Sequence, residues 1–140
     1  MEHLAEAARF RRAVLRFNRR LRQERGDGSL SPNQLSVLGH LYRHGPSTPG
    51  EVAAAERQRP QSLTRVFAEL EAEELVGRAP DPADRRQSVL SLTAAGRRAL
   101  EDDMAQRDAW LATALGALSE TERGVLSLAA SVMERLGGVP

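Results

Sequence analysis

The 140-residue sequence predicts a mainly α-helical protein with one small antiparallel β-hairpin, an α+β arrangement within a single domain. The chain is rich in Ala, Leu and Arg but only 4% aromatic, and this composition favours helices over sheets. Apolar residues recur at helical spacing along most of the chain, and the pattern changes to strict alternation over residues 88–92. The length allows one compact domain and leaves no room for a separate catalytic domain.

Apolar spacing and capping residues predict where the helices begin and end. Residues 2–25 form one long helix, because Leu4, Val14 and Leu21 lie at helical spacing without an intervening Gly or Pro, and Gly26-Asp27-Gly28 ends it. Capping signals predict four more helices. Ser31 caps a helix that runs to about Arg43 and is stopped by His44-Gly45-Pro46, and Thr48 or Ser47 caps a short helix from Pro49 to Glu56. Thr93 caps a helix that runs to about Leu118, and Ser119 caps a last helix that ends at Gly137-Gly138.

The middle of the chain combines two close helices with a hairpin. After a break at residues 57–59, a second helix begins at Pro60 or Gln61 and runs to Glu74. Two helices joined by so short a turn form a helix-turn-helix unit. Residues 75–78 and 88–92 are strand candidates, and the loop 80–86 between them holds two Pro and two Asp, so it cannot be part of the core.

Several classes of protein are excluded by what the sequence lacks. Without cysteine there is no disulfide, thiolate zinc site or thiol redox switch, and no cofactor motif is present. There is no apolar run of 18 residues and no signal-peptide pattern, so we expect a soluble cytoplasmic protein without a membrane partner. We find no nucleophile with a base, no paired-carboxylate cleft and no phosphate-binding Gly loop, so we do not expect an enzyme.

The near-neutral net charge of +1 hides an uneven distribution. Residues 1–25 carry eight Arg against three Glu, a net charge of +5, whereas residues 99–140 carry a net charge of −4. Every basic side chain is an arginine. Local basic clusters of this kind are compatible with binding to nucleic acid but do not establish it.

The helix 60–74 has its charges in the order opposite to the one its dipole favours. No acid lies between residues 57 and 65, whereas the last turns are rich in Glu. A first turn that meets phosphates and base edges explains this inversion, because Gln and Arg suit base edges and hydroxyls suit phosphates. The alternative is an ordinary surface helix with solvated charges. The candidate DNA contacts are Arg57, Arg59, Gln61, Ser62, Thr64 and Arg65.

The hairpin loop carries Asp84, Arg85 and Arg86 at its tip. Exposed arginines on a loop can enter a minor groove or hold phosphates. Asp84 repels phosphate, so its sensible role is to hold one guanidinium in a bidentate pair and fix its direction. Taken alone, a charged loop of this kind is more often just a solubilising turn.

Together these segments resemble the MarR family of bacterial transcriptional regulators. The resemblance rests on Leu75-Val76-Gly77-Arg78, on Asp84 and Arg86 followed after five residues by Leu92-Thr93, and on Ser62-Leu63-Thr64-Arg65 with Leu70-Glu71 upstream. It implies a winged helix-turn-helix with helix 60–74 in the major groove and the wing 81–87 at the flanking minor groove. Glu56, Gln58 and Glu74 depart from the pattern, which has apolar residues at the first two positions and often Gly at the third.

The terminal helices present more apolar surface than a small domain needs, which favours a homodimer over an intramolecular bundle. We therefore expect residues 1–30 and 94–140 to dimerise, residues 31–93 to bind DNA, and the operator to be nearly palindromic.

His40 and His44 have a metal-ligand spacing but no third ligand, so we expect no metal site.

The resemblance implies a repressor released by a small aromatic or anionic effector, for which Arg12, Arg16, His40 and Trp110 are the candidate contacts. The alternative function is a winged-helix module that binds protein instead of DNA.

Overall fold

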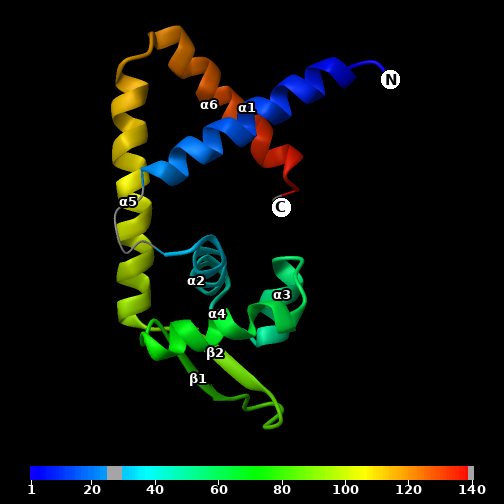
Figure 1. Ribbon diagram of the computed structural model, residues 1–140, viewed down its shortest axis with the longest axis vertical. Helices are drawn as coiled ribbons and strands as arrows, with labels where there is room; N and C mark the ends of the chain where they lie inside the picture. The colour runs from blue at the N-terminus through cyan, green and yellow to red at the C-terminus, as the bar shows by residue number, and fades with distance from the viewer. Residues whose placement is uncertain (25–29, 139–140) are drawn as a thin grey trace. The chain divides into compact units, whose positions relative to one another are not determined.

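The computed structural model describes residues 1–24 and 30–138 and has the predicted fold class (Figure 1). The predicted helix end at Gly26-Asp27-Gly28 lies outside these residues. The helices are α1 (Leu4–Gln23), α2 (Pro32–His44), α3 (Pro49–Ala55), α4 (Pro60–Ala72), α5 (Ala94–Gly116) and α6 (Glu120–Leu136), and the strands are β1 (Val76–Pro80) and β2 (Ser88–Leu92). None of the helices within the described ranges is long and apolar enough to span a membrane.

The chain divides into two compact units, and α5 contributes to both. Unit 1 comprises residues 1–24 and 106–140, and unit 2 comprises residues 25–105. Unit 2 therefore contains α2, α3, α4, the hairpin and the first half of α5. Unit 1 contains α1, the second half of α5 and α6.

The predicted helix caps form in the structure. Ser31 and Ser119 each close a reciprocal capping box, with Gln34 and Glu122 as their respective partners. The Thr48 hydroxyl accepts a hydrogen bond from the Glu51 amide at 3.1 Å. Each cap satisfies backbone amides that the first helical turn leaves without a partner, which is why these residue types start helices.

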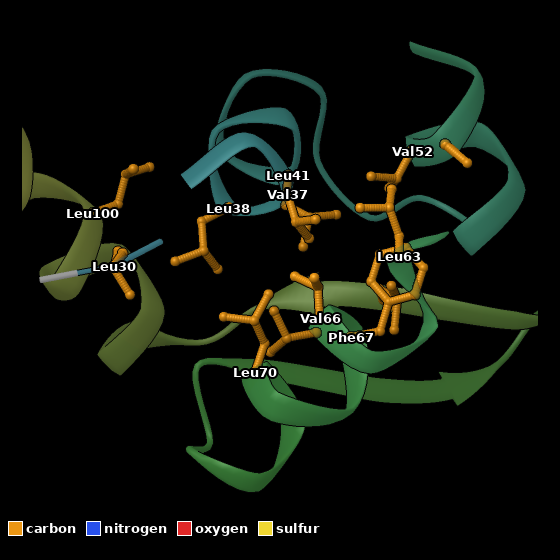
Figure 2. Close-up of a cluster of buried hydrophobic side chains, with 13 residues drawn as sticks. Leu30, Val37, Leu38, Leu41, Val52, Leu63, Val66, Phe67, Leu70 and Leu100 are labelled. Atoms are coloured by element: carbon orange, nitrogen blue, oxygen red, sulfur yellow. The ribbon is translucent and has the colours of Figure 1, made fainter. Parts of the chain in front are cut away.

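The core of unit 2 lies where α2, α3 and α4 meet above the hairpin. Figure 2 shows apolar side chains from these helices pointing toward one another, with Leu30 and Leu100 at one side. The fully buried members, which anchor the helix-turn-helix, are Val37, Leu38, Val52, Leu63, Leu70 and Leu90. Because α4 buries only this apolar face, its opposite face stays at the surface.

The wing is a two-stranded hairpin with a short third pairing. β1 and β2 run antiparallel from Val76 opposite Leu92 to Pro80 opposite Ser88. Ser47, just before α3, adds an isolated bridge to Leu90 through hydrogen bonds of 3.0 and 2.8 Å. This bridge ties the wing to the start of the helix-turn-helix.

The join between α4 and the wing depends on Glu74, Thr93 and Gly96. Glu74 adopts a left-handed φ of 59°, so α4 ends at Ala72, two residues earlier than predicted. The Thr93 hydroxyl donates to the Glu74 carbonyl at 2.7 Å and accepts from the Gly96 amide at 2.9 Å. A Cβ on Gly96 would lie 2.0 Å from the Leu75 carbonyl oxygen, so only glycine allows α5 to pack this closely on the start of β1.

Replacing Glu74 with Gly is expected to raise the free energy of unfolding by about 1 kcal/mol, because glycine adopts the left-handed conformation without steric cost. Urea denaturation at one fixed protein concentration measures it. Glu73 has an ordinary φ of −85°, so Glu73→Gly is the matched control and should destabilise the protein. Equal destabilisation by both changes would show that the Glu74 conformation carries no strain.

Unit 1 differs from unit 2 because its helices bury little. None of the residues of α1 or α6, all of which the structure describes, is buried. The Trp110 ring contacts the Phe17 ring at a centroid distance of 6.4 Å, and the Arg20 guanidinium lies 4.9 Å from the Trp110 ring centre. A groove of about 430 Å³ remains open and is lined only by apolar side chains: Phe10, Val125, Leu128, Ala129, Val132, Met133 and Leu136.

Candidate nucleic-acid interface

The turn between α3 and α4 is held by polar contacts. Arg57 takes a left-handed φ of 54°, which turns the chain sharply. The Gln58 amide donates to the Ala53 carbonyl at 2.9 Å, and its side chain donates to the Asn33 side chain at 3.4 Å. Glu56 and Gln58 are half-buried. The polar departures from the family pattern are therefore accommodated, with Gln58 bonded to the start of α2.

The first turns of α4 place their polar side chains at the surface. Leu63, Val66, Phe67 and Leu70 anchor the helix in the core, so the residues between them face outward. The Thr64 hydroxyl donates to the Pro60 carbonyl at 3.1 Å, which fixes its rotamer. All six of the candidate contacts here are exposed, namely Arg57, Arg59, Gln61, Ser62, Thr64 and Arg65.

The acids in the second half of α4 are engaged by cations and amides. Arg65 Nε donates to Glu69 Oε1 at 3.0 Å, and the Arg65 side chain nevertheless remains 91% exposed. Arg78, on β1, forms two hydrogen bonds to the Glu71 carboxylate, at 2.8 and 3.1 Å. The pair of Glu71 and Arg78 joins α4 to the wing, a contact that sequence spacing does not reveal because it crosses from a helix to a strand.

The wing tip is a structured turn in which Asp84 holds Arg86. Asp84 Oδ1 accepts from the Arg86 amide and from Arg86 Nε, both at 3.1 Å, and Asp84 Oδ2 accepts from Nη2 at 3.4 Å. The side-chain hydrogen bond from Arg86, followed by the backbone one, lowers the pKa of Asp84. Arg86 is 91% exposed and Arg85 is also exposed. Asp84 therefore fixes the direction of Arg86.

The four candidate effector contacts lie in different units. Arg12, Arg16 and Trp110 belong to unit 1, and His40 belongs to unit 2. Arg12 and Arg16 are exposed, whereas Trp110 is half-buried. In the described part of the chain, no three His, Cys, Asp or Glu side chains come together in a way that could hold a metal ion.

His40 is a buried histidine on α2. Its Nε2 lies 3.1 Å from the Ser47 hydroxyl, and its ring lies 4.7 Å from the ring of His44, centre to centre. Only 6% of the residue is exposed. Burial, and then electrostatic repulsion from His44, lowers the pKa of His40; Arg43 acts in the same direction, and two carboxylates, Glu56 and Glu51, oppose it.

This lowered pKa predicts acid destabilisation. As the pH falls through about 6.5, the unfolded chain takes up a proton on His40 before the folded chain does, so the free energy of unfolding decreases; above that pH the contribution is fully present. Urea denaturation of wild type and His40→Gln between pH 7.5 and pH 5 should show a flatter profile for the variant. His3→Gln is the control, because His3 is exposed and belongs to unit 1. Parallel profiles for wild type and His40→Gln would contradict the assignment.

Comparisons with known proteins agree with this arrangement. A family model described as MarR family matches residues 29–87. An uncharacterized HTH-type transcriptional regulator of Mycobacterium bovis is 40% identical over 121 residues, which are 86% of this chain and 85% of the relative.

Solved structures show similarity along nearly the whole chain. A Pseudomonas aeruginosa protein described as a transcriptional regulator has a TM-score of 0.85 at 38% identity and covers 99% of this chain and 98% of its own. Bordetella bronchiseptica BpsR, described as regulated in DNA binding by 6-hydroxynicotinic acid, has a TM-score of 0.67 at 25% identity over 96% of each chain. The chain thus belongs to the MarR family and is a DNA-binding transcriptional regulator with a winged helix-turn-helix.

Proposed function

We propose that this regulator reads its operator with the first turns of α4 in the major groove and with the wing tip at the flanking minor groove. The observation that carries the proposal is a feature shared by two arginines. Arg65 and Arg86 each have Nε held by a carboxylate, at 3.0 and 3.1 Å, while 91% of each side chain remains exposed. Held guanidinium groups that still face outward suit recognition of bases and phosphates. Arg57, Arg59, Gln61, Ser62, Thr64 and Arg85 complete the proposed contacts, with Asp84 positioning Arg86.

We infer that the working unit is a homodimer formed by the helices at the two ends of the chain. The support is the exposed apolar surface of unit 1, where Leu128 is 66% exposed and Leu136 is 75% exposed. Monomeric proteins rarely leave contiguous apolar surface of this kind uncovered, and a second copy covers it with the same surface. The predicted dimerisation segments 1–30 and 94–140 and the DNA-binding lobe 31–93 remain predictions on the same basis.

We further propose that the dimer represses transcription in the cytoplasm until a small aromatic or anionic molecule releases it. The similarity to BpsR supports regulation by a small ligand. Arg12, Arg16, Trp110 and His40 remain the proposed contacts. A ligand changes DNA binding only as far as its affinity differs between the conformation that binds DNA and the one that does not.

Selection of bound duplexes from a random-sequence DNA pool tests the proposed function. We expect a nearly palindromic sequence with half-sites about one helical turn (~34 Å) apart. Binding to this sequence should weaken steeply as salt increases, because arginine–phosphate contacts release counterions. Recovery of no sequence, or an affinity that does not change with salt, would favour a module that binds protein instead.

A further inference from the structure

A chain of hydrogen bonds links the start of α2 to Arg65. Both oxygens of the Glu69 carboxylate are used: Oε1 accepts from Arg65 Nε at 3.0 Å, and Oε2 accepts from Gln34 Nε2 at 3.4 Å. The Glu69 side chain is 40% exposed, whereas that of Arg65 is 91% exposed. Glu69 thus lies between an anchored amide and an outward-facing guanidinium.

Gln34 is itself fixed by the cap of α2. The Ser31 amide donates to Gln34 Oε1 at 2.9 Å, and the Gln34 amide donates to the Ser31 hydroxyl at 3.2 Å. Since the side-chain oxygen of Gln34 is taken up by an N–H donor, its NH₂ group is the end that faces Glu69. The capping box therefore sets both the position and the orientation of the group that holds Glu69.

Neither stability nor bulk electrostatics accounts for a carboxylate at this position. An exposed ion pair four residues apart on a helix contributes little to folding. An acid beside the DNA-facing turns also repels phosphate, which weakens binding to every DNA sequence. Asp84 likewise holds Arg86 with its carboxylate, through both Nε and Nη2. In both places a residue unfavourable for binding DNA holds an arginine that the proposed function needs.

We propose that Glu69 is a positioning residue that directs Arg65 toward a base edge, and that Gln34 holds Glu69 for this task. Engaging Nε leaves the two terminal nitrogens of the guanidinium to form a bidentate pair with guanine. The inference rests on the proposed role of α4 as the element that reads DNA. It gives Glu69 and Gln34 a part in sequence specificity, which both exert through Arg65. Gln34 lies on α2, whereas Arg65 and Glu69 lie on α4.

Gln34→Glu tests the contact with Glu69 without removing the cap that α2 needs to fold. The new carboxylate still accepts from the Ser31 amide, which preserves the capping box, but it removes the donor to Glu69 and places a like charge beside it. The measured quantity is the ratio of affinities for the selected operator and for a scrambled duplex of equal length at one salt concentration. We expect this ratio to fall about tenfold, within the range that one bidentate base contact supplies.

Asn33→Asp is the matched control for charge. It adds the same charge one residue earlier and keeps the oxygen that accepts from the Gln58 side chain. The affinity ratio should change less than about twofold, since no base contact is altered. An equal fall in the ratio for Asn33→Asp and Gln34→Glu would overturn the proposal, because added charge would then explain both.

Glu69→Ala gives a second test, in which the affinity for scrambled DNA and the affinity ratio are expected to change in opposite directions. If Glu69 only repels DNA, its removal strengthens binding to operator and scrambled duplex alike, and an unchanged affinity ratio would overturn the proposal. If Glu69 positions Arg65, binding to scrambled DNA strengthens while the ratio falls. Thermal unfolding followed by circular dichroism checks that each variant folds.

Arg65→Ala distinguishes this inference from the proposed function. If Arg65→Ala leaves the affinity ratio unchanged, Arg65 does not read a base, and both its place in the proposed function and its positioning by Glu69 fail. If Arg65→Ala lowers the ratio but Glu69→Ala does not, only the positioning role is overturned. In the Arg65→Ala background, Glu69→Ala should lower the ratio no further, because the residue it positions is absent.

Discussion

Replacing Leu128 with Glu is expected to convert the proposed dimer to monomers and to weaken operator binding by about 10²- to 10⁴-fold, because the two half-sites are then no longer bound by one linked molecule. Leu128 lines the apolar groove of unit 1 and is 66% exposed, so the new carboxylate is solvated in the monomer and need not unfold it. At an interface between two copies the same charge would be stripped of water without a partner. Light scattering after size-exclusion chromatography gives the mass, and gel-shift titration gives the affinity.

Ser127→Glu is the matched control for this prediction. Ser127 is exposed on α6 but does not line the groove, so the same substitution should leave the protein dimeric and bound to DNA. A Leu128→Glu variant that still has the mass of a dimer would show that α6 does not form the interface. A wild-type protein that is monomeric at micromolar concentration would contradict the dimer itself.

Arg86→Ala is expected to weaken operator binding by about 1–3 kcal/mol, which is roughly 5- to 150-fold. Arg86 is the wing arginine that Asp84 holds, so the variant removes a guanidinium whose direction is already set. Gel-shift titration on the selected operator measures the change. Arg135→Ala, which removes the same charge from the exposed end of α6, should have a much smaller effect. Equal effects of the two variants would mean that only net charge matters.

Much of the fold was predictable because its signals are local. Ser31, Thr48 and Ser119 cap helices through atoms within three residues of themselves, so sequence spacing alone locates these helix starts. The end of α4 was not predictable in this way. Glu74 adopts a left-handed conformation that its residue type disfavours, and the hydrogen bond from the Thr93 hydroxyl to its carbonyl spans 19 residues.

The structure extends β1 further than the sequence predicts. The sequence pattern indicates a strand over residues 75–78 and a loop over 80–86, but Pro80 pairs with Ser88 in the structure. Pro lacks an amide hydrogen, and this is tolerated at the last position of a strand that has only one partner. The ends of α5 and α6 lie within two residues of the prediction.

The candidate site was predictable as a set of exposed residues but not as a set of pairs. The apolar residues of α4 recur every three or four positions from Leu63 to Leu70, which implies that the residues between them lie at the surface. Which wing arginine Asp84 holds depends on the conformation of a tight turn, and the contact of Gln34 with Glu69 depends on how α2 packs on α4. Such pairings arise from tertiary structure and leave no periodic signal.

Hydroxyl-radical and methylation protection of the selected operator tests the central claim most directly. A dimer that reads DNA with α4 and the wing should protect two major-groove segments 10–10.5 base pairs apart, each flanked by a protected minor groove. Arg86→Ala should remove the outer minor-groove protection and keep the two inner segments. A single protected segment without two-fold symmetry, or a footprint that Arg86→Ala leaves unchanged, would contradict the account.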